Sequence, residues 1–173
     1  MLYTKQIDQI TYEDVVTFCG EGTREGFNLD YKRELPTNNE TLAKWIAAFA
    51  NTYGGLLIIG INANDGLPEE PFQGFDFDEN ISYDEKILSV ILSYIHQPVF
   101  PEVKVCDPVD GKSFIVIRIA ESELTPHRIG DRVRIYIRTG EISNPIDEAN
   151  WEKLEWLKLR RKNSIELRKS LIE

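Results

Sequence analysis

The chain has 173 residues, 42% of them hydrophobic and 28% charged, which is enough for one domain with an apolar core. The net charge of −9 argues against a protein that coats nucleic acid non-specifically, although residues 151–173 alone carry a charge of +3. Neither a signal-peptide pattern nor an apolar run of about 20 residues is present, so we expect a cytoplasmic protein that has no membrane partner. Cys19 and Cys106 lack the spacing of a zinc or disulfide framework.

The first part of the sequence predicts helix, strand and helix in turn. Thr11 is a suitable N-cap for a short helix over residues 12–18. Residues 27–35 alternate in polarity, which predicts a half-exposed strand with Asp30 and Lys32 on one face. Apolar residues at spacings of three and four then predict a helix over residues 39–53.

Gly54 and Gly55 interrupt this helical pattern. Two glycines permit the positive φ angles that a tight turn after a helix requires. The continuous apolar run at residues 56–61 predicts a central strand that is buried on both faces. The prolines, glycines and acids of residues 62–80 indicate a solvated loop.

The second part of the sequence predicts a helix, three strands and a final helix. The helix covers residues 83–95, and the strands cover 102–106, 113–120 and 132–138. From Asp147 the pattern is helical almost to the end. We therefore expect an α+β fold, with a mixed central sheet and packed helices in residues 1–146 and a helical extension in residues 147–173.

Two charged groups are candidates for chemistry or binding. Glu25 and Asp30, with Lys32 nearby, could hold the divalent metal of a nuclease, but an ordinary surface ion pair is the favoured interpretation. In the strand at 132–138, alternation places Arg132, Arg134, Tyr136 and Arg138 on one exposed ridge. Such a ridge is suited to phosphates and stacked bases, unless its arginines pair with this protein's own acids.

The final helix combines an apolar stripe with a basic cluster, Arg160-Arg161-Lys162. The cluster is either a solvated face or a DNA contact, and the helix is a candidate for homo-oligomerisation. The stripe contains Trp151, Leu154, Leu157, Ile165 and Ile172. A phosphate-binding P-loop is excluded at Gly111-Lys112-Ser113, because position 106 is cysteine and the tripeptide enters a strand.

Several blocks together resemble the Schlafen AlbA-like domain over about residues 21–146. The most specific is Ala48-Phe49-Ala50-Asn51-Thr52-Tyr53-Gly54-Gly55; the others are Asp30-Tyr31-Lys32, Leu57 to Asn62, Asp65-Gly66 and Tyr136 to Gly140. The resemblance implies a mixed α/β module that binds nucleic acid, often in bacterial transcriptional regulators. In vertebrate relatives it also implies an RNA endonuclease site of three acids, with positions matching Glu25, Asp30 and Ala63. Asp65 lies two residues beyond the third position.

We therefore expect a regulatory domain that binds nucleic acid, first of all DNA, through Lys32, Arg33, Arg128, Arg132, Arg134 and Arg138. The alternatives are a metal-dependent nuclease that uses Glu25, Asp30 and Asp65, and a protein-interaction module. Ala63 in place of an acid and the absence of a P-loop count against an enzyme but leave the question open, and we expect no cofactor. A divalent metal is expected only if the nuclease alternative holds.

Overall fold

The structure is a computed structural model that describes residues 2–131, 134–142 and 144–171. Its helices are the short 3₁₀ turn η1 (Ile7–Gln9), α1 (Tyr12–Gly20), α2 (Asn39–Asn51), α3 (Tyr83–Tyr94) and α4 (Trp151–Ser170). Its strands are β1 (Leu29–Lys32), β2 (Gly55–Ile59), β3 (Ala63–Asn64), β4 (Leu67–Pro68), β5 (Phe75–Asp76), β6 (Ile95–His96), β7 (Glu102–Val105), β8 (Lys112–Ser113), β9 (Ile115–Ile119), β10 (Arg128–Ile129), β11 (Arg134–Arg138) and β12 (Ile146–Glu148).

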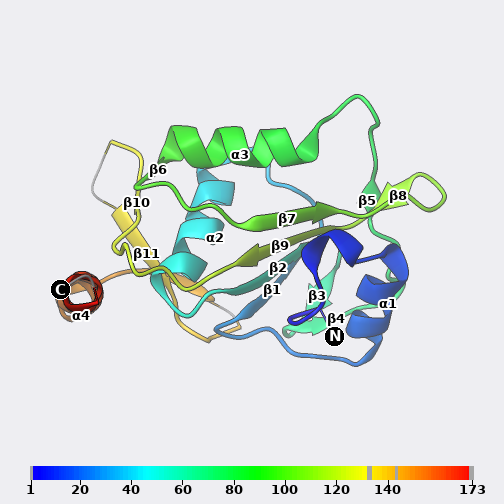
Figure 1. The fold of residues 1–173 in the computed structure, drawn as a ribbon. Helices are drawn as coiled ribbons and strands as arrows, with labels where there is room; N and C mark the ends of the chain where they lie inside the picture. Colours follow the sequence, from blue (N-terminus) through cyan, green and yellow to red (C-terminus); the bar gives the residue numbers. More distant parts are fainter. Residues whose placement is uncertain (1, 132–133, 143, 172–173) are drawn as a thin grey trace.

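The central sheet has four strands in the order β1-β2-β9-β7 (Figure 1). β1 runs parallel to β2, while β2 with β9 and β9 with β7 are antiparallel. In this register Asp30 lies beside Leu57 and Lys32 beside Ile59. The sheet confirms the predicted α+β fold with a mixed sheet, and it places the charged strand next to the apolar strand that follows the glycine pair.

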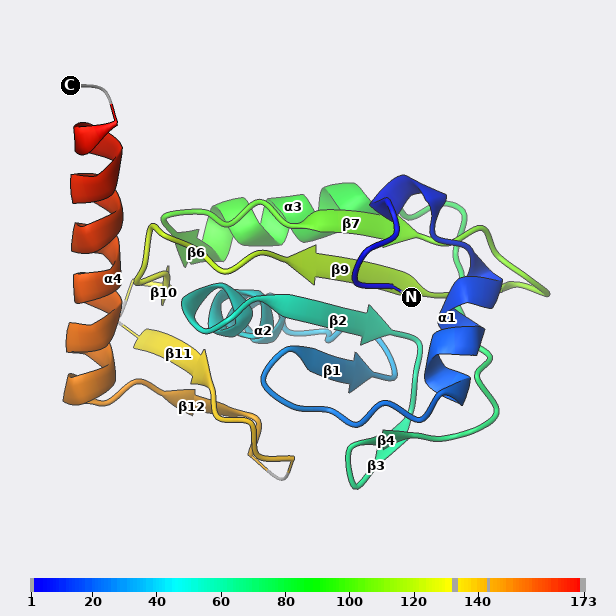
Figure 2. The ribbon, with the colours of Figure 1, turned by 60° about the horizontal axis from the view of Figure 1, so that its bottom comes forward.

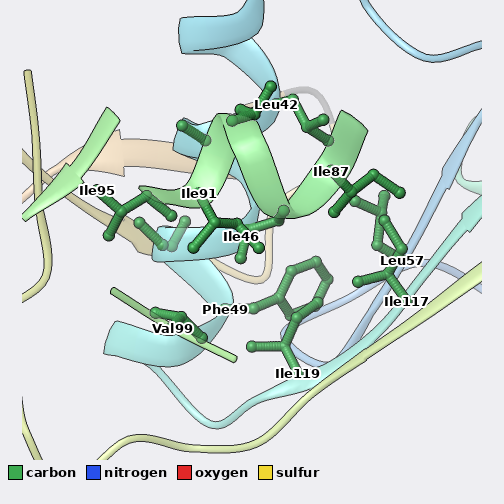
Figure 3. Close-up of a cluster of buried hydrophobic side chains, with 14 of the residues drawn as sticks. Leu42, Ile46, Phe49, Leu57, Ile87, Ile91, Ile95, Val99, Ile117 and Ile119 are labelled. Carbon is green, nitrogen blue, oxygen red and sulfur yellow. The ribbon is translucent and has the colours of Figure 1, made fainter. Parts of the chain in front are cut away.

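Each face of the central sheet has its own apolar core. On one face, α2 and α3 cover alternate residues of β2 and β9, among them Leu57, Ile117 and Ile119 (Figure 3). On the other face, α1 and the N-terminal segment cover Leu56 and Ile58. Because both faces are covered, every side chain from Leu56 to Ile59 is buried, as the continuous apolar run predicted.

A second sheet, entirely antiparallel, lies on the far side of α2 in the order β12-β11-β10-β6 (Figure 2). Its inner residues Ile129 and Tyr136 join the core that α2 forms with the central sheet. Its outer residues Ile135 and Ile137 pack against Leu157 of α4. The final helix is therefore attached to the rest of the chain by a small core of its own.

Several local predictions are confirmed and others are corrected. Thr11 caps α1 through a reciprocal pair of hydrogen bonds with Asp14. The final helix begins at Trp151 rather than Asp147, because Asn150 supplies the N-cap and residues 146–148 pair with β11. Residues 62–80 contain the strands β3, β4 and β5 in addition to loops.

The apolar stripe predicted for the final helix is only partly buried. Leu157 is fully buried and Leu154 packs beside it, whereas Trp151 is 70% exposed. Ile165 is also exposed, and Ile172 lies outside the described residues. Within the described ranges, no helix is long and apolar enough to cross a membrane.

Candidate nucleic-acid interface

Asp30 is buried completely in β1, and two cations hold its carboxylate. The Arg138 guanidinium and the Lys32 ammonium each donate to one carboxylate oxygen. Arg138 Nη2 donates to the carbonyl oxygens of Gly26 at 2.6 Å and Leu29 at 3.1 Å. The carboxylate face of β1 therefore points into the molecule, which corrects the prediction of a half-exposed strand. A buried carboxylate needs such pairing to offset its lost hydration.

The prediction of an exposed ridge on β11 is wrong, although the predicted alternation of side chains between the two faces of the strand is correct. Arg134, Tyr136 and Arg138 do share one face, but α2 packs across that face. Tyr136 is consequently 8% exposed and Arg138 only 2% exposed. Arg138 belongs to the interior and is not available to a phosphate on the surface. Arg132 lies outside the described residues.

The end of α2 is fastened to the second sheet by side-chain hydrogen bonds. Asn51 Nδ2 donates to the carbonyl oxygens of His127 and Tyr136, each at 2.9 Å, and Asn51 Oδ1 accepts from His127 N at 2.8 Å. Thr52 Oγ1 accepts from Arg138 N and donates to Ala48 O, both at 2.8 Å. These two residues fix the register of α2 against β10 and β11. This is the structural role of the asparagine and threonine in the Asn-Thr-x-Gly-Gly block.

Basic and aromatic side chains gather around the outer face of α2. Lys32 Nζ lies 5.2 Å from the centre of the Trp45 ring, and Lys44 Nζ lies 4.4 Å from that of Tyr136. Arg134 Nη1 lies 4.0 Å from a carboxylate oxygen of Glu40, in the first turn of α2. We call this set, with Arg33 beside Lys32, the α2 surface: Lys32, Arg33, Lys44, Trp45 and Arg134.

The α2 surface keeps part of its charge in contact with solvent. The side chains of Arg33, Arg134 and Lys32 are 76%, 42% and 24% exposed. Lys44 lies over the Tyr136 ring, which holds it in place without neutralising it, whereas Lys32 is paired with Asp30. Such cations, beside the partly exposed ring of Trp45, match the phosphates and bases of a nucleic acid.

Arg128 is not brought together with this set. It lies directly opposite Ile135 across the β10–β11 pair, whereas its neighbour Ile129 lies opposite Arg134. Residues directly opposite each other share a face of a sheet, so Arg128 and Arg134 lie on opposite faces. Of the six predicted binding residues, Lys32, Arg33 and Arg134 lie around α2.

Of the predicted acids, Glu25 and Asp30 are neighbours, whereas Asp65 lies apart from them. Glu25 Oε1 accepts from Tyr31 N at 2.8 Å; burial raises the pKa of Glu25, and the neighbouring charge of Asp30 raises it further. Asp65 is instead exposed in the β3–β4 turn, where its carboxylate lies 3.2 Å from Arg24 Nη1. Throughout the described ranges, no three His, Cys, Asp or Glu side chains are grouped as a metal site requires.

The family model described as "Schlafen, AlbA_2" matches residues 25–147, well over half of the chain. The chain belongs to this family. The match covers β1, α2, the glycine pair and β11, the elements that hold Asp30, Asn51 and Arg138 together.

Two solved structures resemble this Schlafen AlbA_2 domain at 20% identity. The DIP2311 protein from Corynebacterium diphtheriae has a TM-score of 0.51, with 84% of this chain and 29% of that chain covered. The N-terminal domain of a RecG-related protein from Nitrosomonas europaea has a TM-score of 0.48, with 66% and 75% covered. The chain thus spans less than a third of the length of the first. The comparison with curated proteins found no match.

Two members of the α2 surface, Lys44 and Trp45, were missed in the sequence. They lie in the predicted helix 39–53, off the apolar stripe of Leu42, Ile46 and Phe49. A helical projection of that segment would have placed them on the outer face. Their approach to Lys32 and Tyr136 depends on the two sheets flanking α2, which no local pattern reveals.

Proposed function

We propose that this Schlafen AlbA_2 domain binds nucleic acid, with DNA as the first candidate, in a regulatory role. The observation that carries the proposal is the α2 surface, where Lys32 and Lys44 lie over aromatic rings and Arg134 lies beside Glu40 of the same helix. On this chain of net charge −9, the side chains of Arg33 and Arg134 keep 76% and 42% of their surface exposed at this place. Membership of a family whose name is associated with nucleic acid supports the same proposal.

Binding through this surface should depend strongly on salt, because each phosphate that a cation neutralises releases counterions. We expect the double variant Lys44→Glu/Arg134→Glu to weaken binding at least tenfold for all sequences alike. The logarithmic salt slope should become shallower by about 1 for each phosphate that is no longer neutralised. Fluorescence anisotropy with labelled DNA and RNA at several salt concentrations measures both quantities.

A matched control makes the same change in charge elsewhere. Lys86 lies on α3, and Lys104 lies on β7, at the opposite edge of the central sheet from β1. Lys86→Glu/Lys104→Glu should leave most of the affinity intact. If both double variants weaken binding equally, only the overall charge matters, and the α2 surface is not the interface.

A metal-dependent nuclease is the second candidate, because Glu25 and Asp30 are neighbours. Against it stand the two cations that already hold Asp30, and the exposed turn that pairs Asp65 with Arg24 instead. Incubating labelled RNA and DNA with the domain, with and without Mn²⁺, tests it directly. Metal-dependent cleavage that Asp30→Asn abolishes would establish the nuclease in place of a simple binding domain.

A further inference from the structure

Three partly exposed aromatic rings line one cavity of about 460 Å³ near the end of α2. Phe27, Tyr53 and Trp156 are 45%, 56% and 42% exposed. The ring of Tyr53 lies 5.5 Å from that of Phe27 and 6.5 Å from that of Trp156, edge to face in both pairs. The residues that line the cavity come from the α2–β2 turn, the segment before β1, β11 and the residues after it, and the start of α4.

The backbone holds Tyr53 in this position. Gly54 and Gly55 have φ angles of +67° and +146°, and a Cβ at Gly55 would collide with the Asn28 backbone. Only glycine can lie this close to the Asn28 backbone, so the turn after Tyr53 is held against the segment that precedes β1. Within the Asn-Thr-Tyr-Gly-Gly block, Asn51 and Thr52 are bound internally, and Tyr53 alone presents its side chain to solvent.

The other two rings are also supported. A Cβ at Gly140 would come within 2.5 Å of the Phe27 ring, so Phe27 lies directly against that glycine. The Arg160 guanidinium lies 4.7 Å from the centre of a Trp156 ring, and it donates to the carbonyl oxygens of Asn51 and Thr52. The aromatic wall is therefore organised before any ligand arrives, which lowers the entropic cost of binding.

Polar groups complete the cavity. Arg138 also borders it, but its guanidinium is buried against Asp30 and two backbone carbonyls. Asp147 and Lys153 also line the cavity and are exposed. A carboxylate accepts from the exocyclic amine of a base, and an ammonium pairs with a phosphate.

We propose that this cavity receives an unpaired base of a single-stranded nucleic acid. The proposal rests on the proposed function and specifies the form of the ligand. Every base has a face that can stack on an aromatic side chain, and the cavity is of the size usual for small-molecule sites. Tyr53 follows α2 directly, and from Lys44 to Tyr53 the helical rise is roughly 13 Å. One strand can therefore meet the α2 surface with its phosphates and this cavity with a base.

A methylated ammonium ion is the competing ligand for an aromatic cavity. It requires rings that surround an open centre. Here the rings follow one another in a row, and the acids Glu141 and Asp147 of the lining are matched by Lys153 and the buried Arg138. The arrangement favours a stacked base.

The experiment compares Tyr53→Ala with the intact chain by fluorescence anisotropy, using labelled 15-mers of dT and U, a duplex of equal length, and a dT 15-mer made abasic throughout. We expect tighter binding to single strands than to the duplex, and a loss of about 5-fold to 100-fold in Tyr53→Ala. Tyr53→Phe should retain most of the affinity. The abasic strand should bind weakly, and Tyr53→Ala should not change its affinity. A variant that had merely lost its structure would instead bind every strand less tightly.

The control is Trp151→Ala, which removes an exposed aromatic of α4 that is not part of the cavity. It should change the affinity less than twofold, and thermal melting shows whether each variant is folded. If Tyr53→Ala binds single strands as tightly as the intact chain, or loses equal affinity for the abasic strand, the base site is overturned and the proposed function stands. If the intact chain binds no nucleic acid at all, both proposals fail.

Discussion

Arg134 and Arg138 lie on the same face of the same strand, but their surroundings are opposite. The Arg134 side chain is 42% exposed and lies 4.0 Å from Glu40. The Arg138 side chain is fully buried, and its guanidinium bonds to Asp30 and to two backbone carbonyls. The first can meet a ligand in solution, whereas the second crosslinks β11 to β1.

The difference comes from the way α2 crosses the strand. Near its N-terminal end, α2 places Glu40 beside Arg134 and leaves 42% of the Arg134 side chain exposed. At its C-terminal end, Phe49 lies 4.5 Å from the Arg138 guanidinium, closing that end to solvent. A sequence pattern identifies which residues share a face, but the packing partner determines which of them are functional.

The largest effect expected is from Arg138→Met, which tests whether this arginine is structural. It would leave the buried carboxylate of Asp30 with Lys32 as its remaining cation, and breaking a buried ion pair costs about 3–5 kcal/mol. Urea unfolding followed by circular dichroism measures the loss. Arg134→Met, at the exposed end of the strand, should change the free energy of unfolding by less than about 0.5 kcal/mol.

Adding Asp30→Asn to Arg138→Met provides a further control. If the destabilisation comes from an uncompensated charge, removing that charge should recover part of the lost stability, because the penalty falls on the partner left behind. Equal losses in Arg138→Met and Arg134→Met would contradict the distinction drawn between the two arginines.

Asn51→Ala should have the next largest effect, because it removes the link that sets α2 in register with β10 and β11. The His127 amide and two carbonyl groups lose their partners, and each unsatisfied buried group costs about 1–3 kcal/mol. We expect a loss of at least about 2 kcal/mol in urea unfolding and faster amide exchange at His127. Asn64→Ala, in the exposed β3 strand, serves as the neutral control; a loss as large there would contradict the prediction.

Local patterns predicted most of the fold. The apolar run of β2, the spacing in α2 and α3, and the Thr11 cap each depend on neighbours in sequence, and each was correct. The start of α4 was placed four residues early, because Asp147 is as compatible with a helix as with the strand that β11 makes it adopt. Local periodicity does not show which distant segments pair as strands.

The candidate site was less predictable for the same reason. Asp30 and Arg138 are 108 residues apart and meet only after two sheets have packed on α2. The cavity rings Phe27, Tyr53 and Trp156 come from three separate segments, so no spacing rule connects them. The sequence did contain the Asn-Thr-x-Gly-Gly block. Its two glycines fix the position of Tyr53, the residue with the exposed side chain that directly precedes them.

The smallest effect expected is from Glu25→Gln, beside the carboxylate of Asp30 that Arg138 binds. Burial and then Asp30 raise the pKa of Glu25, so the folded state holds this proton more tightly than the unfolded chain, whose glutamate pKa is about 4.3. Stability from this group is therefore complete below about pH 4, and it falls as pH rises through the raised pKa. Glutamine keeps an acceptor for Tyr31 N but carries no charge.

Glu25→Gln should accordingly match the intact chain in urea unfolding near pH 4 and be slightly more stable at pH 7. The gain should stay below about 1 kcal/mol, because solvent screens a half-exposed carboxylate. Glu69→Gln, at an exposed position, should show no such pH dependence. A Glu25→Gln variant that is less stable than the intact chain at pH 7 would contradict this prediction, because it would mean that the folded state favours the charged form of Glu25.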